Sequence, residues 1–169
     1  MNERIAFCTL GVLKAPVGDP AVQGFVDRLG DVYAVAEGSA GFFDRSVRDV
    51  ETWAHSWGPI TIPQCAPAGV EPDQLAMTLS LWVDLPSVAR FAYRGVHGEA
   101  LAKRGDWFAT GPWPPYVAWW IGADQRPDWS DAADRLDHLH EMGPTPRAFT
   151  FRHAFDAAGT RTSAAPAPE

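Results

Sequence analysis

The sequence is poor in cysteine and has no long hydrophobic run. Cys8 and Cys65 are its two cysteines, and because their positions fit no metal-binding motif we expect two buried thiols, with one disulfide as the alternative. No apolar stretch approaches the roughly 18 residues that a membrane-spanning helix needs. The first residues lack the charged and then apolar pattern of a secretory signal. We therefore expect a cytoplasmic protein that binds no membrane.

Positive charge and the common catalytic motifs are also lacking. The chain has 14 Lys and Arg residues against 21 Asp and Glu residues, a formal net charge of −7, which argues against nucleic acid as a partner. It contains no GxSxG, HExxH, Walker-type or dinucleotide-binding glycine pattern. The usual hydrolase and nucleotide-binding classes therefore lose support.

What the sequence has in abundance is tryptophan. With 169 residues, 46% of them hydrophobic and 21% charged, the composition is that of one folded globular domain. Leucine or valine could supply apolar volume alone, so a large number of indole rings needs another reason. The eight tryptophans are Trp53, Trp57, Trp82, Trp107, Trp113, Trp119, Trp120 and Trp129.

Hydrophobic spacing and breaking residues divide the chain into alternating strands and helices. Asp19 caps a helix that Gly38 ends, and Asp128 or Ser130 caps another that Gly143 ends. The predicted strands are 4–12, 41–47, 75–84, 116–122 and 147–153, and the predicted helices are 20–37, 86–103 and 129–141.

The order strand, helix, strand occurs twice before the last helix and strand. Two consecutive split βαβ units predict a ferredoxin-like α+β fold, with an antiparallel sheet that carries its helices on one face. We expect one domain over residues 1–156 and a disordered C-terminal tail over 157–169. The other face of the sheet would then be bare. Thr78, Ser80 and Trp82 share the mixed face of the third strand, which suits a partner subunit or a ligand and predicts a homodimer.

A polar, proline-rich loop over residues 51–73 is longer than a compact domain usually tolerates without a function. We expect it to cover part of the protein. His55 lies in this loop between two tryptophans and could enter a site if the loop folds over, with a solvated His as the alternative. His138 and His140 are two residues apart on a predicted helix, so they point to nearly opposite faces and cannot readily share a metal.

The most informative segment is the predicted helix over 86–103, where Arg94 and His97 share a face. An Arg beside a His can lower the pKa of the imidazole by like-charge repulsion. The neutral ring that results can act as a base or as a metal ligand near neutral pH. The alternative is a hydrogen-bonded, inert His at the edge of the helix.

Basic residues gather in the same segment. Four of them outnumber two acidic residues there, a local balance of +2 in a chain of −7: Arg90, Arg94, Lys103 and Arg104 against Glu99 and Asp106. A carboxylate, a phosphate or a haem propionate could pair with Arg94 or Arg104 in a bidentate geometry. The alternative is a solvated face whose charges pair with acids elsewhere.

Five tryptophans lie in or beside the second repeat. Trp119 and Trp120 alternate along one predicted strand, so at most one of them can face a given pocket. If one joins Trp82, Trp107 and Trp113, the site is walled by aromatic rings and suits a flat apolar ligand. The alternative is an aromatic core and dimer interface.

Four segments carry a resemblance to a known bacterial family: LSLWVDLPSVARFAYRGVHGEAL, RGDWF, YVAWWIGADQRPDW and RLDHLHEMGPTPRAFTF. Over about residues 5–156 the chain resembles the domain of unknown function 3291 (DUF3291) family, which is placed in the dimeric α/β-barrel superfamily. Gly105 and Asp106 depart from the basic run expected before Trp107. The residues that carry the resemblance are Tyr93-Arg94 with His97, then Trp107, Trp119-Trp120 and Gly143-Pro144-Thr145.

The resemblance implies a class of activity. Relatives in the superfamily include small monooxygenases that use no cofactor, and haem proteins such as chlorite dismutases and aldoxime dehydratases. Several haem members carry the proximal His on the helix of the second repeat, which is where His97 lies in this sequence. The resemblance therefore implies haem ligation by His97, with Arg94 near a propionate or a bound substrate.

These patterns predict an enzyme that transforms a small aromatic or apolar molecule by oxidative, monooxygenase-like chemistry, with haem or without a cofactor. In this hypothesis His97 is the base or axial ligand and Arg94 is the anion or oxyanion partner. The predicted substrate-binding residues are Trp82, Tyr93, Trp107, Trp113 and Trp120, and Arg104 is the further cofactor-binding residue. The alternative is a non-catalytic small-molecule-binding or assembly protein.

Overall fold

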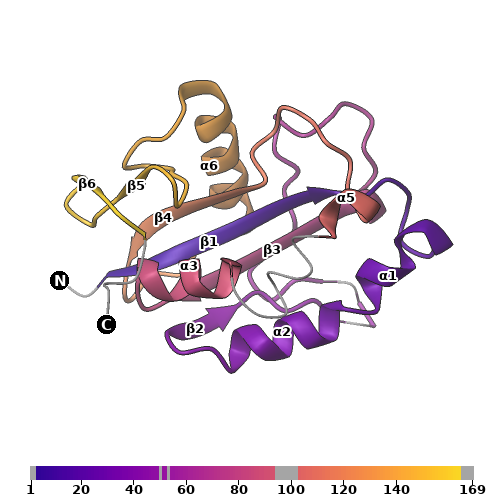
Figure 1. Cartoon of the computed structure of the whole chain (residues 1–169), viewed down its shortest axis with the longest axis horizontal. Helices are drawn as coiled ribbons and strands as arrows, with labels where there is room; N and C mark the ends of the chain where they lie inside the picture. Colours follow the sequence, from indigo (N-terminus) through magenta and orange to yellow (C-terminus); the bar gives the residue numbers. More distant parts are fainter. Residues whose placement is uncertain (1–2, 50, 53, 94–102, 165–169) are drawn as a thin grey trace.

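A four-stranded antiparallel sheet forms the centre of the protein (Figure 1). The computed structural model describes residues 3–49, 51–52, 54–93 and 103–164. The strands lie in the order β2-β3-β1-β4, which is the order that two split βαβ units produce, so the predicted ferredoxin-like α+β fold is confirmed. The strands are β1 Glu3–Val12, β2 Phe42–Arg45, β3 Leu75–Trp82 and β4 Tyr116–Gly122.

Two predicted helices begin at the expected capping residues, and the predicted helix over 86–103 begins as α3 (Leu85–Tyr93), whereas its residues 94–102 lie outside the described residues. Asp19 accepts a hydrogen bond from the Ala21 N–H (2.8 Å), and Asp128 accepts one from the Asp131 N–H (2.8 Å). The predicted helix over 20–37 is divided into three short helices, because Gly24 and Gly30 weaken helix propensity on either side of the break. The helices are η1 Pro20–Val22, α1 Gln23–Val26, α2 Leu29–Glu37, η2 Pro72–Gln74, α3 Leu85–Tyr93, α5 Arg104–Trp107 and α6 Trp129–Met142.

Helices α2 and α3 cover the same face of the sheet, which we call the helix face. Ile5 and Phe7 of β1 pack there with Trp82 of β3, Val88 of α3 and Ala36 of α2. This is the mixed face of β3, so the expectation that it meets a partner or a ligand at Trp82 is wrong. The indole of Trp82 has no exposed surface because α3 and its aromatic neighbours bury it.

The opposite face of the sheet is also covered, so the expectation of a bare face is wrong. Helix α6 returns over this face after β4, and its buried residues recur at the spacing of one apolar helical stripe: Trp129, Ala132, Ala133, Leu136 and Leu139. Trp57 from the long loop packs into the same cluster. The carboxylate of Asp137 accepts the backbone N–H groups of Gln64 (3.0 Å) and Cys65 (2.8 Å), which ties the loop to α6.

The chain after α6 differs from the predicted strand over 147–153. Two tight turns, closed by the pairs Thr145–Ala148 and Thr150–His153, replace a continuous strand. Between these turns Phe149 exchanges two backbone hydrogen bonds with Ala118 of β4, each 2.9 Å long. A small hairpin follows, made of β5 Ala154–Phe155 and β6 Arg161–Thr162. The described part of the predicted disordered tail therefore carries a strand and ends at the buried Ala164.

Both cysteines are free thiols, as predicted. Burial raises the pKa of Cys8 far above its usual range, and burial with the nearby Asp137 carboxylate raises the pKa of Cys65 to about 12. Neither thiol is a thiolate near neutral pH, so neither is an activated nucleophile. Among the described helices, none is long and apolar enough to cross a membrane.

Candidate functional site

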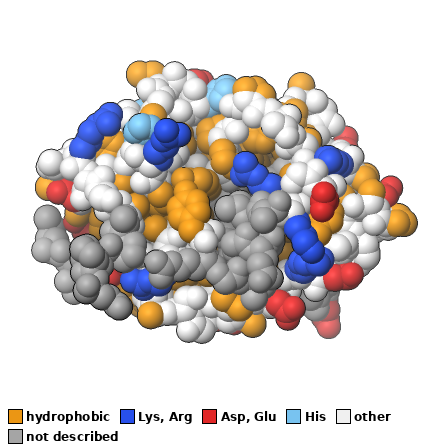
Figure 2. All heavy atoms as spheres, in the orientation of Figure 1, with side chains coloured by type: hydrophobic (Ala, Val, Ile, Leu, Met, Phe, Trp, Pro, Cys, Tyr) orange, Lys and Arg blue, Asp and Glu red, His pale blue; other side chains and the backbone are white. Residues whose placement is uncertain are grey.

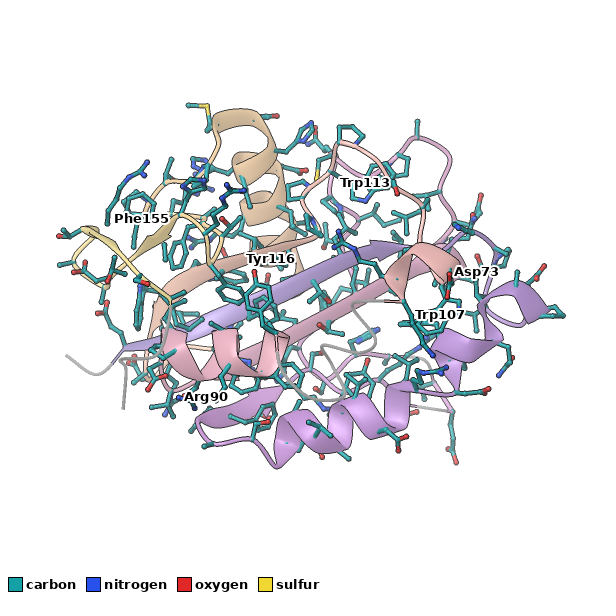
Figure 3. All side chains as sticks on the ribbon, viewed as in Figure 1. Asp73, Arg90, Trp107, Trp113, Tyr116 and Phe155 are labelled. Carbon is teal, nitrogen blue, oxygen red and sulfur yellow. The ribbon has the colours of Figure 1, made fainter. Side chains whose placement is uncertain are left out.

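The structure places the predicted aromatic site residues in three separate clusters. Trp82 lies in the core of the helix face. Trp107 packs with Leu13 and Val22 at the far end of the sheet, and Trp113 packs against the cluster on the opposite face. Figure 3 shows Trp107 at the end of α5 and Trp113 in the segment that leads to β4. The described tryptophans therefore form no single aromatic-walled pocket.

The other predicted site residues have different surroundings. Trp120 is half-buried at the end of β4, where its Nε1–H donates to the Phe155 carbonyl oxygen (2.7 Å). Tyr93 is 56% exposed at the end of α3, and Arg104 is exposed at the start of α5. Arg94 and His97 lie outside the described residues.

A row of hydroxyl groups crosses the middle of the helix face. Thr9 of β1 is in register with Thr78 of β3 on one side and with Tyr116 of β4 on the other. The hydroxyl oxygens of Thr9 and Thr78 are 2.6 Å apart. Ser80 lies two residues further along β3 on the same face. We call Thr9, Thr78, Ser80 and Tyr116 the hydroxyl row, and all four side chains belong to half-buried residues.

The hydroxyl row lies between two covered parts of β1. Towards one end, Phe7 is buried in the cluster that includes α3. Towards the other end, Gly11 lies under the Phe108 ring, and a Cβ atom there would collide with that ring. Figure 3 shows Tyr116 near the middle of the sheet, between these ends. In the space-filling view, hydrophobic side chains reach the surface at the centre of this face (Figure 2).

Two tyrosines extend the hydroxyl row outward. The hydroxyl oxygens of Tyr116 and Tyr93 are 3.3 Å apart. The Phe151 N–H donates to the Tyr116 oxygen (3.2 Å), and either tyrosine can be the donor in the hydrogen bond between the two hydroxyl groups. The exposed Tyr93 hydroxyl can also hydrogen-bond to a ligand. The Tyr116 ring is held by Phe151, which stacks on it with ring centres 4.9 Å apart, and by Phe7 at 5.7 Å.

Tyr116 is a neutral hydrogen-bonding group rather than a phenolate. Burial raises its pKa well above the ordinary value of 10.0, and the hydrogen bond to Tyr93 raises it further. The described part of the site thus offers neutral hydroxyls beside aromatic rings. It can bind a small molecule with an aromatic body and a polar group, and it contributes no charged acid or base of its own.

Sequence reasoning missed two members of this site. Thr9 interrupts an otherwise apolar strand, and Tyr116 begins β4 after a proline-rich turn. A polar residue inside a buried strand was the available signal, but it gains meaning only beside its neighbours on other strands. Thr9 and Thr78 are 69 residues apart in the chain.

The described histidines do not provide a haem site. The His55 ring packs edge-on against Trp129 with ring centres 5.0 Å apart, and His138 Nε2 is 2.8 Å from the Thr145 hydroxyl oxygen. His140 and His153 are exposed on α6 and in a turn. No cluster of three or more His, Cys, Asp or Glu in the described ranges could hold a metal ion. His97, the predicted haem ligand, lies outside the described residues, and we derive no step through haem.

The lowered pKa of His55 makes the stability of the fold depend on pH. Partial burial against Trp129, and then the nearby Arg48 charge, lower its pKa from the ordinary value of 6.5. The unfolded chain therefore takes up this proton at a higher pH than the folded protein does. The contribution of His55 to the free energy of unfolding should be complete above about pH 6.5 and should decrease as the pH falls below it. Urea unfolding between pH 5 and 8 measures this change.

The matched variants for this experiment are His55→Gln and His140→Gln. Removing the buried imidazole should flatten the decrease below pH 6.5, whereas replacing the exposed His140 should leave it as in the wild type. A decrease of the same size in His55→Gln would show that other groups cause it.

Comparison with known proteins gives one match. A family model described as a domain of unknown function (DUF3291) matches residues 4–165. No curated protein and no solved structure matches the chain.

Proposed function

The chain belongs to the DUF3291 family, and we propose that it is an enzyme that transforms a small aromatic or apolar molecule bound on the helix face of the sheet. The observation that carries this proposal is the half-buried hydroxyl row beside the Tyr93–Tyr116 pair. Polar groups in the middle of an otherwise apolar sheet face are costly unless they hydrogen-bond. A ligand whose polar group contacts Thr9 and Thr78 would form the hydrogen bonds that their hydroxyl groups can still make.

The described residues support the binding part of this proposal. The aromatic body of the ligand would lie against the exposed rim formed by Tyr93 and Tyr116, where an aromatic contact adds to the burial of apolar surface. The Tyr93 hydroxyl would donate to a carbonyl or phenolic oxygen. This arrangement selects a small molecule with an aromatic ring and at least one oxygen.

The catalytic part of the proposal rests on the sequence. Arg94 follows Tyr93 directly, and His97 follows three residues later. We assign His97 as the general base that removes a proton from the bound molecule and Arg94 as the partner of the anion that forms, because the hydroxyl row supplies no charged group. The resemblance suggests oxidation of the resulting electron-rich anion by molecular oxygen as the reaction class. One oxygen atom of O2 would enter the product, and the other would leave as water with two hydrogens taken from the substrate.

A non-catalytic binding protein is the second candidate function. It is favoured by the uncharged character of the described site residues, since binding alone needs no acid or base. The two candidate functions differ in the role of His97, because removing His97 would leave binding intact but would abolish turnover.

A dimer that pairs the sheets face to face would have to displace α6 and the loop around Trp57, so the proposed homodimer would use another surface.

Replacement of Thr78 by valine tests the binding site. Calorimetric titration with phenol, catechol, 1-naphthol and indole should identify at least one probe that binds saturably to the wild type. Valine keeps the shape of the side chain but removes its hydroxyl. Thr78→Val should therefore lower the affinity for that probe by about 10-fold, the upper value for one hydrogen bond. Thr162→Val, on exposed β6, is the matched control and should leave the affinity unchanged.

Two results would contradict the binding site. One is the absence of saturable binding for all four probes. The other is equal affinity in Thr78→Val and the wild type for every probe that binds.

A further inference from the structure

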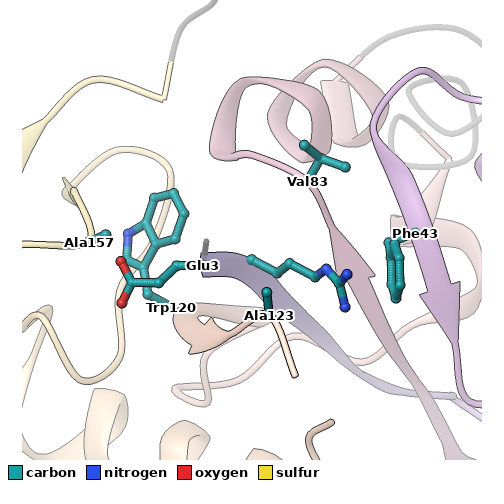
Figure 4. Close-up of a pocket in the computed structure, with 7 residues that line it drawn as sticks. Glu3, Phe43, Val83, Trp120, Ala123 and Ala157 are labelled. Carbon is teal, nitrogen blue, oxygen red and sulfur yellow. The ribbon is translucent and has the colours of Figure 1, made fainter. Parts of the chain in front are cut away.

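A hollow lies at the end of the sheet where β1 begins and β3 and β4 end (Figure 4). It is open to solvent and has a volume of about 570 Å³. None of the hydroxyl row residues lines it, so it is separate from the site proposed above. The hollow is lined by Glu3, Arg4, Phe43, Val83, Trp120, Ala123 and Ala157.

Arg4 offers an unused cationic group to this hollow. Its guanidinium carbon lies 3.3 Å from the centre of the Phe43 ring, so the two planar groups are in close contact. This contact orients the guanidinium but uses none of its five N–H donors. Within the described ranges, Arg4 makes no hydrogen bond and no ion pair. Its donors are therefore available to a carboxylate, which a guanidinium binds through two parallel hydrogen bonds.

Glu3 offers an unused anionic group on another wall. Figure 4 shows its side chain beside Trp120, with Phe43 on the other side of the hollow. Neighbouring residues of a strand point to opposite sides, and the structure contains no ion pair between Glu3 and Arg4. The Trp120 ring is fixed by the hydrogen bond from its Nε1–H to the Phe155 carbonyl oxygen (2.7 Å). Among the described residues, the Glu3 carboxylate therefore has no ion-pair partner, and it lies beside a fixed aromatic ring.

Apolar surface surrounds the two charges. Phe43 is 47% exposed and Val83 is 53% exposed, which is high for large hydrophobic side chains. Ala123 and Ala157 complete the lining with small side chains. A ligand with an apolar middle would remove part of this surface from water, and that removal is favourable in proportion to the area.

We propose that this hollow is a binding site for a small amino carboxylate. The carboxylate of the ligand pairs with the Arg4 guanidinium, its ammonium group lies near the Glu3 carboxylate, and its apolar middle lies against the apolar lining of the hollow. The ligand needs both charges, because Glu3 would repel a ligand that carries only a negative charge and Arg4 would repel a ligand that carries only a positive charge.

Calorimetry or ligand-observed NMR with three probes of matched length tests this proposal. The zwitterion 6-aminohexanoate should bind saturably to the full-length protein. Hexanoate and hexylamine, which each lack one charge, should bind at least about 10-fold more weakly, the ratio that one lost charge-assisted hydrogen bond produces. This comparison uses the wild type alone, so it does not depend on how any variant folds.

Two charge-removing variants complete the test. Arg4→Gln and Glu3→Gln should each lower the affinity of the protein for 6-aminohexanoate by about 10-fold. Arg152→Gln, at an exposed turn, should leave this affinity unchanged. The proposal is overturned if 6-aminohexanoate does not bind at millimolar concentrations. It is also overturned if hexanoate or hexylamine binds as tightly, or if both charge-removing variants bind like the wild type.

Discussion

Replacing Trp82 by alanine is expected to lower the free energy of unfolding by about 3 to 5 kcal/mol, the usual cost of removing a buried Trp side chain. The Trp82 indole has no exposed surface. It stacks on Phe91 with ring centres 5.0 Å apart and meets Phe42 edge-on at 5.3 Å. Alanine would remove these contacts and leave a cavity under α3. Urea or guanidinium unfolding followed by far-UV circular dichroism measures the loss.

Two further variants make this prediction specific. Trp82→Phe keeps most of the ring contacts but loses the hydrogen bond from Nε1–H to the Ser80 hydroxyl oxygen (3.0 Å), so it should cost clearly less than alanine. Phe43→Ala removes a large aromatic side chain that is 47% exposed, and it should also cost less. A loss below about 1 kcal/mol for Trp82→Ala, the range of surface substitutions, would contradict a core role for this tryptophan.

Replacing His97 by alanine is expected to reduce turnover at least about 100-fold, the lower value for a positioned general base. Binding of the same substrate should change little, because the hydroxyl row and the tyrosine pair remain. The assay follows oxygen consumption and product formation with whichever aromatic probe binds in calorimetry. His140→Ala, at an exposed position of α6, is the matched control and should keep full activity.

The His97 experiment separates the two candidate functions. Loss of turnover with unchanged binding supports the enzyme. If the wild type binds the probe without converting it, or if His97→Ala turns over at the wild-type rate, the role assigned to His97 is wrong. In the first of these cases the non-catalytic binding protein is the better description, whereas in the second the protein is still an enzyme and its base is another residue.

Much of the fold could be predicted because its signals are local. Asp19 and Asp128 cap helices through hydrogen bonds within three residues, and Gly143 ends α6 with a φ of 72°, which glycine adopts at little cost. The alternation of Leu75–Trp82 identifies a strand because its period is two. The prediction of a strand over 147–153 is wrong because the hydrophobic pattern of this segment does not reveal the two tight turns that interrupt it.

The side of the sheet on which α6 lies could not be predicted. Its apolar stripe shows that α6 must cover something, but both faces of β3 and β4 were available to it. The structure places Leu136 against the face that contains Leu79 and Val117. This choice leaves neither face bare, and it explains why the predicted pairing of two sheets lost its support.

The candidate site was predictable only in part. Tyr93 could be identified from the sequence because it belongs to the segment that resembles the family. Alternation along the third strand placed Thr78 and Ser80 on a candidate ligand face, but Thr9 and Tyr116 could not be identified, because they become neighbours of Thr78 only through the register of three strands. The prediction of one aromatic-walled pocket failed for the opposite reason, since Trp107 and Trp113 are near each other in the sequence but pack into different clusters.

The most direct test of the central claim is a titration of the ¹⁵N-labelled protein with the aromatic probe that binds most tightly, followed by NMR. If the molecule binds on the helix face, the largest shifts in amide resonances should occur at Thr9, Thr78 and Tyr116, and they should saturate with one affinity. Shifts confined to α6 and Trp57, or to the hollow around Arg4, would contradict the claim.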